Sequence, residues 1–145
     1  MKTIQSIFLA LLVSFTFFSC DNDSDDPIII DENPLAEFNL LTNIKANAHT
    51  IEVYSEQQQY TIGYNEFFFR IKDNATESYI ADAAISMNPI MHMTSMMHSC
   101  PKSEITKTTD ATVYKGFSVF QMPGNADENW DLNIENSIDG QTFGA

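Results

Sequence analysis

The chain has 145 residues and a formal net charge of −13, with seven Lys and Arg against 20 Asp and Glu. This length suits a single domain, and a hydrophobic fraction of 43% is enough to build a buried core. Because a phosphate backbone is bound by clustered Lys and Arg, the scattered cations and the acidic charge exclude nucleic acid as an expected partner.

Residues 1–19 have the pattern of an export signal. Lys2 precedes an apolar run over residues 7–18, shorter than the roughly 20 residues that a membrane-spanning helix needs. Ser19 and Cys20 follow directly. This ending resembles the lipobox of bacterial lipoproteins, which implies that Cys20 receives the lipid and anchors the mature protein in a membrane. The alternative is an ordinary cleaved signal followed by a cysteine by chance.

Residues 20–37 are predicted to form a lipidated acidic tether. Six Asp and Glu lie within residues 21–32, with no Lys or Arg until Lys45, and such a charge run stays solvated. Pro27 and Pro34 disfavour regular structure. A lipidated cysteine followed by clustered Asp resembles the export signal of surface-exposed outer-membrane lipoproteins of the Bacteroidota type. The resemblance implies an outer-membrane, lipid-anchored protein on the cell surface.

Residues 38–145 are predicted to form one all-β domain. No amphipathic helix longer than two turns is present, and Asp139-Gly140 is typical of a hairpin turn. About seven short strands separated by turns predict an immunoglobulin-like β-sandwich. The strands are expected from alternating, β-branched or aromatic residues at 49–54, 63–71, 79–87, 112–121 and 130–135, with an edge strand at 38–44.

The segment 87–101 departs furthest from average composition. It holds five of the seven methionines, two of the three histidines and Cys100, which has no disulfide partner once Cys20 is lipidated. Thioether, thiolate and imidazole groups are the ligands that Cu(I) prefers. The segment therefore predicts a Cu(I) site, with candidate ligands Met91, His92, Met93, Met96, Met97, His98 and Cys100.

The sequence is compatible with either an extended strand or a helical turn in this segment. An extended strand places Met87, Met91, Met93 and Met97 on one face, and His92, Met96, His98 and Cys100 on the other. A helical turn instead groups Met93, Met96, Met97 and Cys100. Methionine is also a flexible filler of apolar gaps. The alternative function is therefore a surface adhesion or assembly module, in which the segment packs against a partner or a neighbouring domain.

Three other chemistries have weaker support. A structural zinc site wants four His or Cys ligands, and this segment supplies three at most. A Cys–His enzyme that uses Cys100 lacks a recognisable orienting acid or oxyanion donor. The acids Asp127, Glu128 and Asp131 surround Trp130, but their place at a loop-to-strand junction favours a solvated turn over paired catalytic acids. We therefore expect a protein that is not an enzyme.

The order of motifs over residues 49–136 resembles the YtkA/FixH-like domains. A strand leads into the Met/His cluster, Tyr114 begins a later strand, and Met122-Pro123-Gly124 and Trp130-Asp131-Leu132 follow. The resemblance implies an immunoglobulin-like sandwich and an association with copper handling or heavy-metal systems in the envelope. The loop at 125–129 and Cys100 depart from the pattern. We expect a non-catalytic envelope lipoprotein that binds or buffers Cu(I), with a metal-handling or assembly partner in the envelope.

Overall fold

The computed structural model describes residues 33–144 of the chain. The predicted signal peptide, the lipid-accepting Cys20 and most of the tether lie outside the described residues. The described part consists of strands, turns and loops without a helix, which confirms the predicted all-β class. Accordingly, none of its elements is a helix long and apolar enough to cross a membrane.

Eleven strands are present within residues 33–144 and form three hydrogen-bonded sheets. In chain order they are β1 Asn39–Ala46, β2 His49–Ser55, β3 Gly63–Asp73, β4 Ala83–Met87, β5 Ile90–His92, β6 Met97–Ser99, β7 Thr106–Lys107, β8 Tyr114–Phe120, β9 Asn129–Asp131, β10 Ile134–Ile138 and β11 Gln141–Gly144.

One layer of the fold is a five-stranded antiparallel sheet with the order β1-β2-β3-β8-β7. Its inner face is formed by every second residue of β2 and β3, as the alternation of apolar residues in the sequence predicts. Val53 on β2 and Phe67 and Phe69 on β3 are completely buried, while Phe68 points to the opposite face of the sheet. The predicted strand at 38–44 is confirmed as the edge strand β1, which has a bulge between Leu40 and Thr42.

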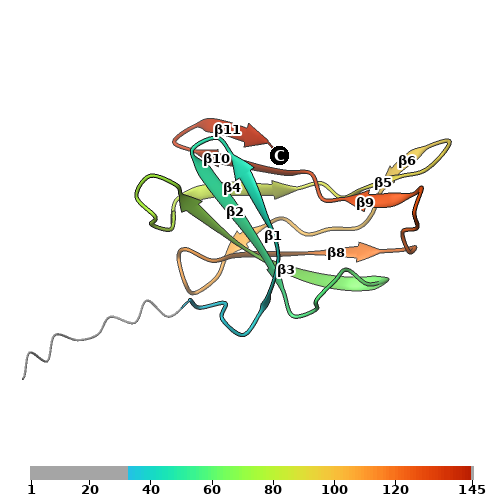
Figure 1. Cartoon of the computed structure of the whole chain (residues 1–145), viewed down its shortest axis with the longest axis horizontal. Helices are drawn as coiled ribbons and strands as arrows, with labels where there is room; N and C mark the ends of the chain where they lie inside the picture. The colour runs from blue at the N-terminus through green and yellow to red at the C-terminus, as the bar shows by residue number, and fades with distance from the viewer. Residues whose placement is uncertain (1–32, 145) are drawn as a thin grey trace, which may run out of the picture. The chain divides into compact units, whose positions relative to one another are not determined.

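The second layer combines the sheets β11-β10-β4 and β6-β5-β9. In Figure 1, β4 leads into β5 and β9 leads into β10 along nearly the same line. The interruption between β4 and β5 lies beside the interruption between β9 and β10, because the Asn88 N–H donates to the Asn133 carbonyl at 2.9 Å. The two layers enclose one core and make an immunoglobulin-like β-sandwich, as predicted. Its strands outnumber the expected seven because two long strands are interrupted and others are very short.

Asn33 and Leu35, which lie in the predicted tether, pack against the strands. Leu35 is buried against Tyr54 and Val113 in a second small cluster, to which Phe38 also packs. The side-chain carbonyl of Asn33 accepts a hydrogen bond of 2.9 Å from the buried guanidinium of Arg70 on β3. The last residues of the predicted tether therefore belong to the folded domain.

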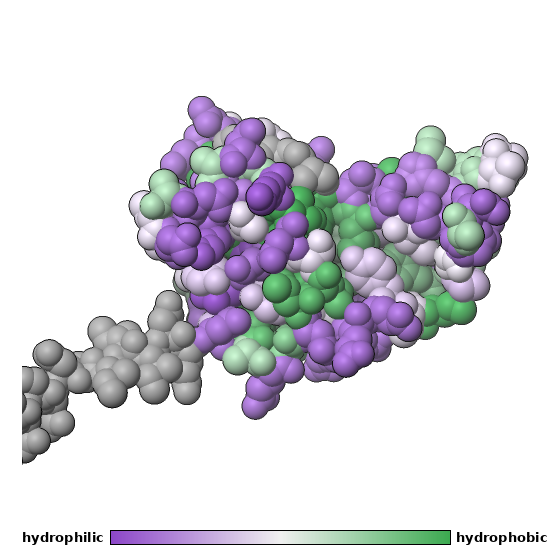
Figure 2. All heavy atoms as spheres, in the orientation of Figure 1, coloured by the Kyte–Doolittle hydropathy of each residue, from purple (hydrophilic) through white to green (hydrophobic). Residues whose placement is uncertain are grey.

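Three segments meet at one end of the sandwich, on the right in Figure 1. They are the β5–β6 hairpin, the loop at 56–62 and the loop at 121–128. Figure 2 shows hydrophilic residues over most of the visible face, with hydrophobic residues gathered in its middle. Ile62, Met96 and Met97 are large hydrophobic residues that remain exposed at this end.

Candidate functional site: a methionine-rich hairpin beside Trp130

The Met-rich segment folds as the β5–β6 hairpin. Ile90 pairs with Ser99, and the strands reverse at Thr94-Ser95. The Met93 N–H donates to the Met96 carbonyl at 3.0 Å across this turn. The segment is therefore extended and reversed, and it does not form the alternative helical turn.

The reversal changes which side chains share a face. Met91 lies opposite His98 on β6 and opposite Trp130 on β9. Since cross-strand pairs two positions apart share a face, Met93 and Met96 belong to the same face as Met91 and His98.

The pair His92 and Met97 takes the opposite face of the hairpin. The grouping expected for one continuous strand, with Met91, Met93 and Met97 together, is therefore wrong. That expectation assumed that the chain keeps its direction through the segment, whereas the turn at Thr94-Ser95 reverses it.

Burial divides most of the sulfur-containing side chains of this segment into two groups, while Met93 is half-buried. Met87 and Met91 are 2% and 1% exposed, and Cys100 is also buried in the main core. Met96 and Met97 are 60% and 67% exposed. The packing interpretation of methionine therefore fits Met87 and Met91, but it leaves two thioethers in solvent.

The imidazole of His98 is held edge-on against the indole of Trp130, with ring centroids 5.4 Å apart and an interplanar angle of 89°. Its Nδ1 lies 3.2 Å from the Ser99 carbonyl oxygen. In the tautomer that carries its proton on Nδ1, the ring donates to this carbonyl and leaves the Nε2 lone pair available. A metal-binding histidine is commonly oriented by such a hydrogen bond from its other nitrogen.

On the other face, His92 is already engaged by a carboxylate. Its Nε2 lies 3.0 Å from Oδ2 of Asp131, and both side chains are about half exposed. An exposed pair of this kind contributes little to stability, about 0–1 kcal/mol. This face has two soft donors, His92 and Met97. The opposite face has three outside the core, namely Met93, Met96 and His98.

Trp130 is fixed by contacts that only the tertiary structure creates. Its indole N–H donates to the Met122 carbonyl at 3.0 Å, and its ring packs on Phe120 with centroids 4.9 Å apart. The tip of the hairpin is tied to the neighbouring loop, because Thr94 donates from its backbone N–H and its hydroxyl to Glu128 at 3.3 Å. Sequence reasoning did not assign Trp130 to the site, since its place opposite Met91 depends on strand register.

The geometry gives little support to a thiol enzyme, to paired catalytic acids or to a metal site of His, Cys and acidic ligands. Burial raises the pKa of the Cys100 thiol, whereas a nucleophilic cysteine needs a lowered pKa. Of the three acids near Trp130, Glu128 contacts Thr94 and Asp131 contacts His92, while the backbone N–H of Asp127 is bound by Asn125 in the turn. Within residues 33–144, no group of three or more His, Cys, Asp or Glu side chains is arranged to hold a metal ion.

Comparison with known proteins gives no assignment: no family model, no curated protein and no solved structure matches this chain. The resemblance to YtkA/FixH-like domains therefore stays a prediction from the motifs.

Proposed function

We propose that this chain is a lipid-anchored envelope protein that binds Cu(I) at the turn end of the β5–β6 hairpin. The proposed ligands are the thioethers of Met93 and Met96 and Nε2 of His98. The supporting observation is the reversal at Thr94-Ser95, which sets Met93 opposite Met96 on the face of His98.

The donor set suits a soft monovalent ion. Two thioethers and one neutral imidazole carry no negative charge, so they favour Cu(I) over Mg²⁺, Ca²⁺ or a structural zinc ion. Methionine also keeps its donor atom in an oxidising compartment, where thiols are lost to disulfides. The indole of Trp130 stands beside His98 and holds this imidazole next to the proposed thioether ligands.

The proposed ligand set is smaller than the set expected from the sequence. It leaves out Met91 and Cys100, which are core residues, and His92 and Met97, which turn to the other face. The export signal, Cys20 and the acidic run support anchoring at the outer membrane and exposure at the cell surface.

The test is an anaerobic Cu(I) titration of residues 21–145 against a competing chelator. The chain from residue 21 omits the lipid-accepting Cys20 but keeps the packing of Asn33 and Leu35. Met93→Leu combined with Met96→Leu conserves volume, so the fold is expected to persist while Cu(I) binding weakens by at least about tenfold, about 1.4 kcal/mol.

Met97→Leu is the matched control, because Met97 is as exposed as Met96 but faces away from His98. It should bind Cu(I) like the unmodified protein. Equal binding by all three proteins, or loss in the Met97 variant alone, would contradict the proposed site.

An absence of tight Cu(I) binding by the unmodified chain would favour the second candidate, an adhesion or assembly module. The exposure of Met96 and Met97 is the observation that supports that alternative, because Met-rich surfaces adapt to protein partners.

A further inference from the structure

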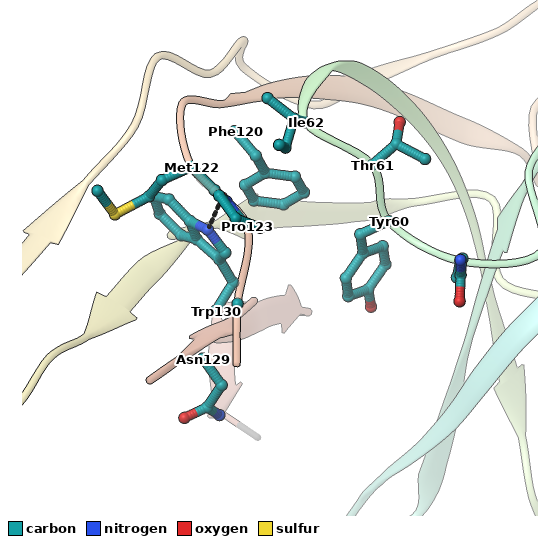
Figure 3. Close-up of a pocket in the computed structure, with 10 residues that line it drawn as sticks. Tyr60, Thr61, Ile62, Phe120, Met122, Pro123, Asn129 and Trp130 are labelled. Carbon is teal, nitrogen blue, oxygen red and sulfur yellow. Dashed lines mark hydrogen bonds between the residues drawn. The ribbon is translucent and has the colours of Figure 1, made fainter. Parts of the chain in front are cut away.

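A cleft of about 430 Å³ opens beside Trp130, at the same end of the sandwich as the hairpin. This volume falls within the usual range for small-molecule sites. Figure 3 shows Tyr60 and Trp130 on opposite sides of the cleft, with Phe120 between them. Phe120 contacts both rings, at centroid distances of 5.8 Å to Tyr60 and 4.9 Å to Trp130. Three aromatic side chains therefore form one continuous apolar surface in the cleft.

One wall of the cleft is held in place by Asn65, a buried residue near the start of β3. Its side-chain amide donates to the carbonyls of Thr61 at 2.7 Å and Gly63 at 2.9 Å, and its carbonyl accepts the Thr61 N–H at 2.9 Å. Gly63 has a φ of 98°, a conformation that favours glycine. Tyr60 is further fixed by an edge contact with Phe67, at 5.5 Å between centroids.

The opposite wall is held by the turn at 122–130. The indole N–H of Trp130 is bound to the Met122 carbonyl, as the dashed line in Figure 3 shows. The side-chain carbonyl of Asn125 accepts the N–H groups of Asp127 and Glu128, each at 2.9 Å. Since both walls are braced by hydrogen bonds, the cleft is formed before any ligand enters.

The lining of the cleft carries no charge, although the chain as a whole has a net charge of −13. Its polar groups are amides and hydroxyls. Within the described part of the chain, the Tyr60 hydroxyl and the Gln59 amide make no hydrogen bond, and both residues belong to the lining of the cleft. Asn129 adds a second amide, whose Nδ2 contacts Asp131 at 3.2 Å.

We propose that this cleft binds a neutral pyranose ring. A pyranose presents an apolar face of C–H groups, which suits stacking on aromatic rings, and an equatorial rim of hydroxyls that both donate and accept hydrogen bonds. The aromatic surface of Tyr60, Phe120 and Trp130 matches the first feature. The amides of Gln59 and Asn129 and the Tyr60 hydroxyl match the hydroxyl rim, because amides and hydroxyls can also donate and accept hydrogen bonds. The absence of Lys and Arg from the lining argues against an acidic sugar.

The only tryptophan of the chain lies in this cleft, so its fluorescence reports binding directly. The probes are the methyl glycosides of glucose, galactose, mannose, xylose and N-acetylglucosamine, with methyl galacturonide as the charged match to galactose. Metal-free residues 21–145 should show a saturable change in Trp130 emission with at least one neutral glycoside, with a dissociation constant of about 1 mM or below. Galacturonide should bind more weakly. The absence of metal makes this result independent of the proposed Cu(I) site.

Two conservative variants locate the ligand. Tyr60→Phe keeps the ring and removes the free hydroxyl, so it should weaken binding about three- to tenfold. Tyr64→Phe makes the same chemical change outside the cleft, on an exposed residue, and should leave affinity unchanged. A flat response to all five neutral glycosides, tighter binding of galacturonide, or full affinity in Tyr60→Phe would each overturn the proposal.

Discussion

The imidazole of His98 meets the indole of Trp130 edge to face, with centroids 5.4 Å apart. Trp130 also lines the aromatic cleft and donates its N–H to the loop at Met122. One indole therefore lies between the proposed Cu(I) ligands and the proposed sugar site. Both kinds of ligand are expected to change the emission of the same fluorophore, and the variants at Met93, Met96 and Tyr60 separate the two effects.

Met91 and Met96 should differ strongly in their contribution to stability. Met91 is 1% exposed, so Met91→Ala opens a cavity and is expected to lower the free energy of unfolding by about 2–5 kcal/mol. Met96 is 60% exposed, so Met96→Ala should change it by no more than about 0.5 kcal/mol. Urea unfolding without metal measures both. Similar losses in the two variants would contradict the division into packing and exposed methionines.

Tyr114 joins the two layers through its hydroxyl. This buried group accepts the Ala83 N–H at 3.0 Å and donates to the Ile80 carbonyl at 3.2 Å. Tyr114→Phe leaves both backbone groups without this partner, which should cost about 1–3 kcal/mol in urea unfolding. Tyr64→Phe removes a hydroxyl from an exposed residue and serves as the neutral control. A Tyr114 variant as stable as that control would show that the two hydrogen bonds are unimportant.

Stability should fall in alkali partly through Tyr54. Burial, together with the hydrogen bond from its hydroxyl to Glu52 at 2.8 Å, raises the pKa of Tyr54 from 10.0 to about 12. Because the folded-state pKa is raised, the contribution is complete below about pH 10 and is lost as the pH rises towards about 12. The free energy of unfolding should therefore decrease across this interval, and the decrease should be shallower in Tyr54→Phe. Identical pH profiles for the two proteins would count against this role.

Cys100 should behave as an inert core residue. Burial raises the pKa of its thiol, and the side chain belongs to the main hydrophobic cluster. Iodoacetamide at neutral pH should therefore modify the native chain from residue 21 onward much more slowly than the same chain in urea. Equal rates in the native and unfolded states would show that the thiol is accessible, and they would revive the thiol-enzyme hypothesis.

Much of the fold can be predicted from local patterns. Alternation at 49–54 and 63–71 predicts β2 and β3, because the inward positions of a strand recur every second residue. Asp139-Gly140 predicts the β10–β11 hairpin, and both residues have the positive φ that such a turn requires, 51° and 78°. These features depend on neighbouring residues, so the sequence carries them directly.

The arrangement of the candidate site depends on contacts that local patterns do not encode. The turn at Thr94-Ser95 lacks the Asn-Gly or Asp-Gly signal of a tight hairpin, so the reversal of the Met-rich segment is hidden in the sequence. The pairing of β5 with β9 then decides which methionines face the core. This pairing sets Met91 opposite Trp130, a residue more than 30 positions away in the sequence. The cleft joins residues 59–62 to residues 120–130 and is equally remote from any local signal.

X-ray absorption at the copper edge of the Cu(I)-loaded chain from residue 21 onward tests the proposed ligand set at the level of atoms. The proposed ligands predict a first shell of two sulfur atoms and one imidazole nitrogen, from Met93, Met96 and His98. Met97→Leu should leave this shell unchanged, whereas Met96→Leu should remove one sulfur. A shell of nitrogen and oxygen alone, or one that loses sulfur in Met97→Leu and not in Met96→Leu, would rule out Met93, Met96 and His98 as the Cu(I) ligands.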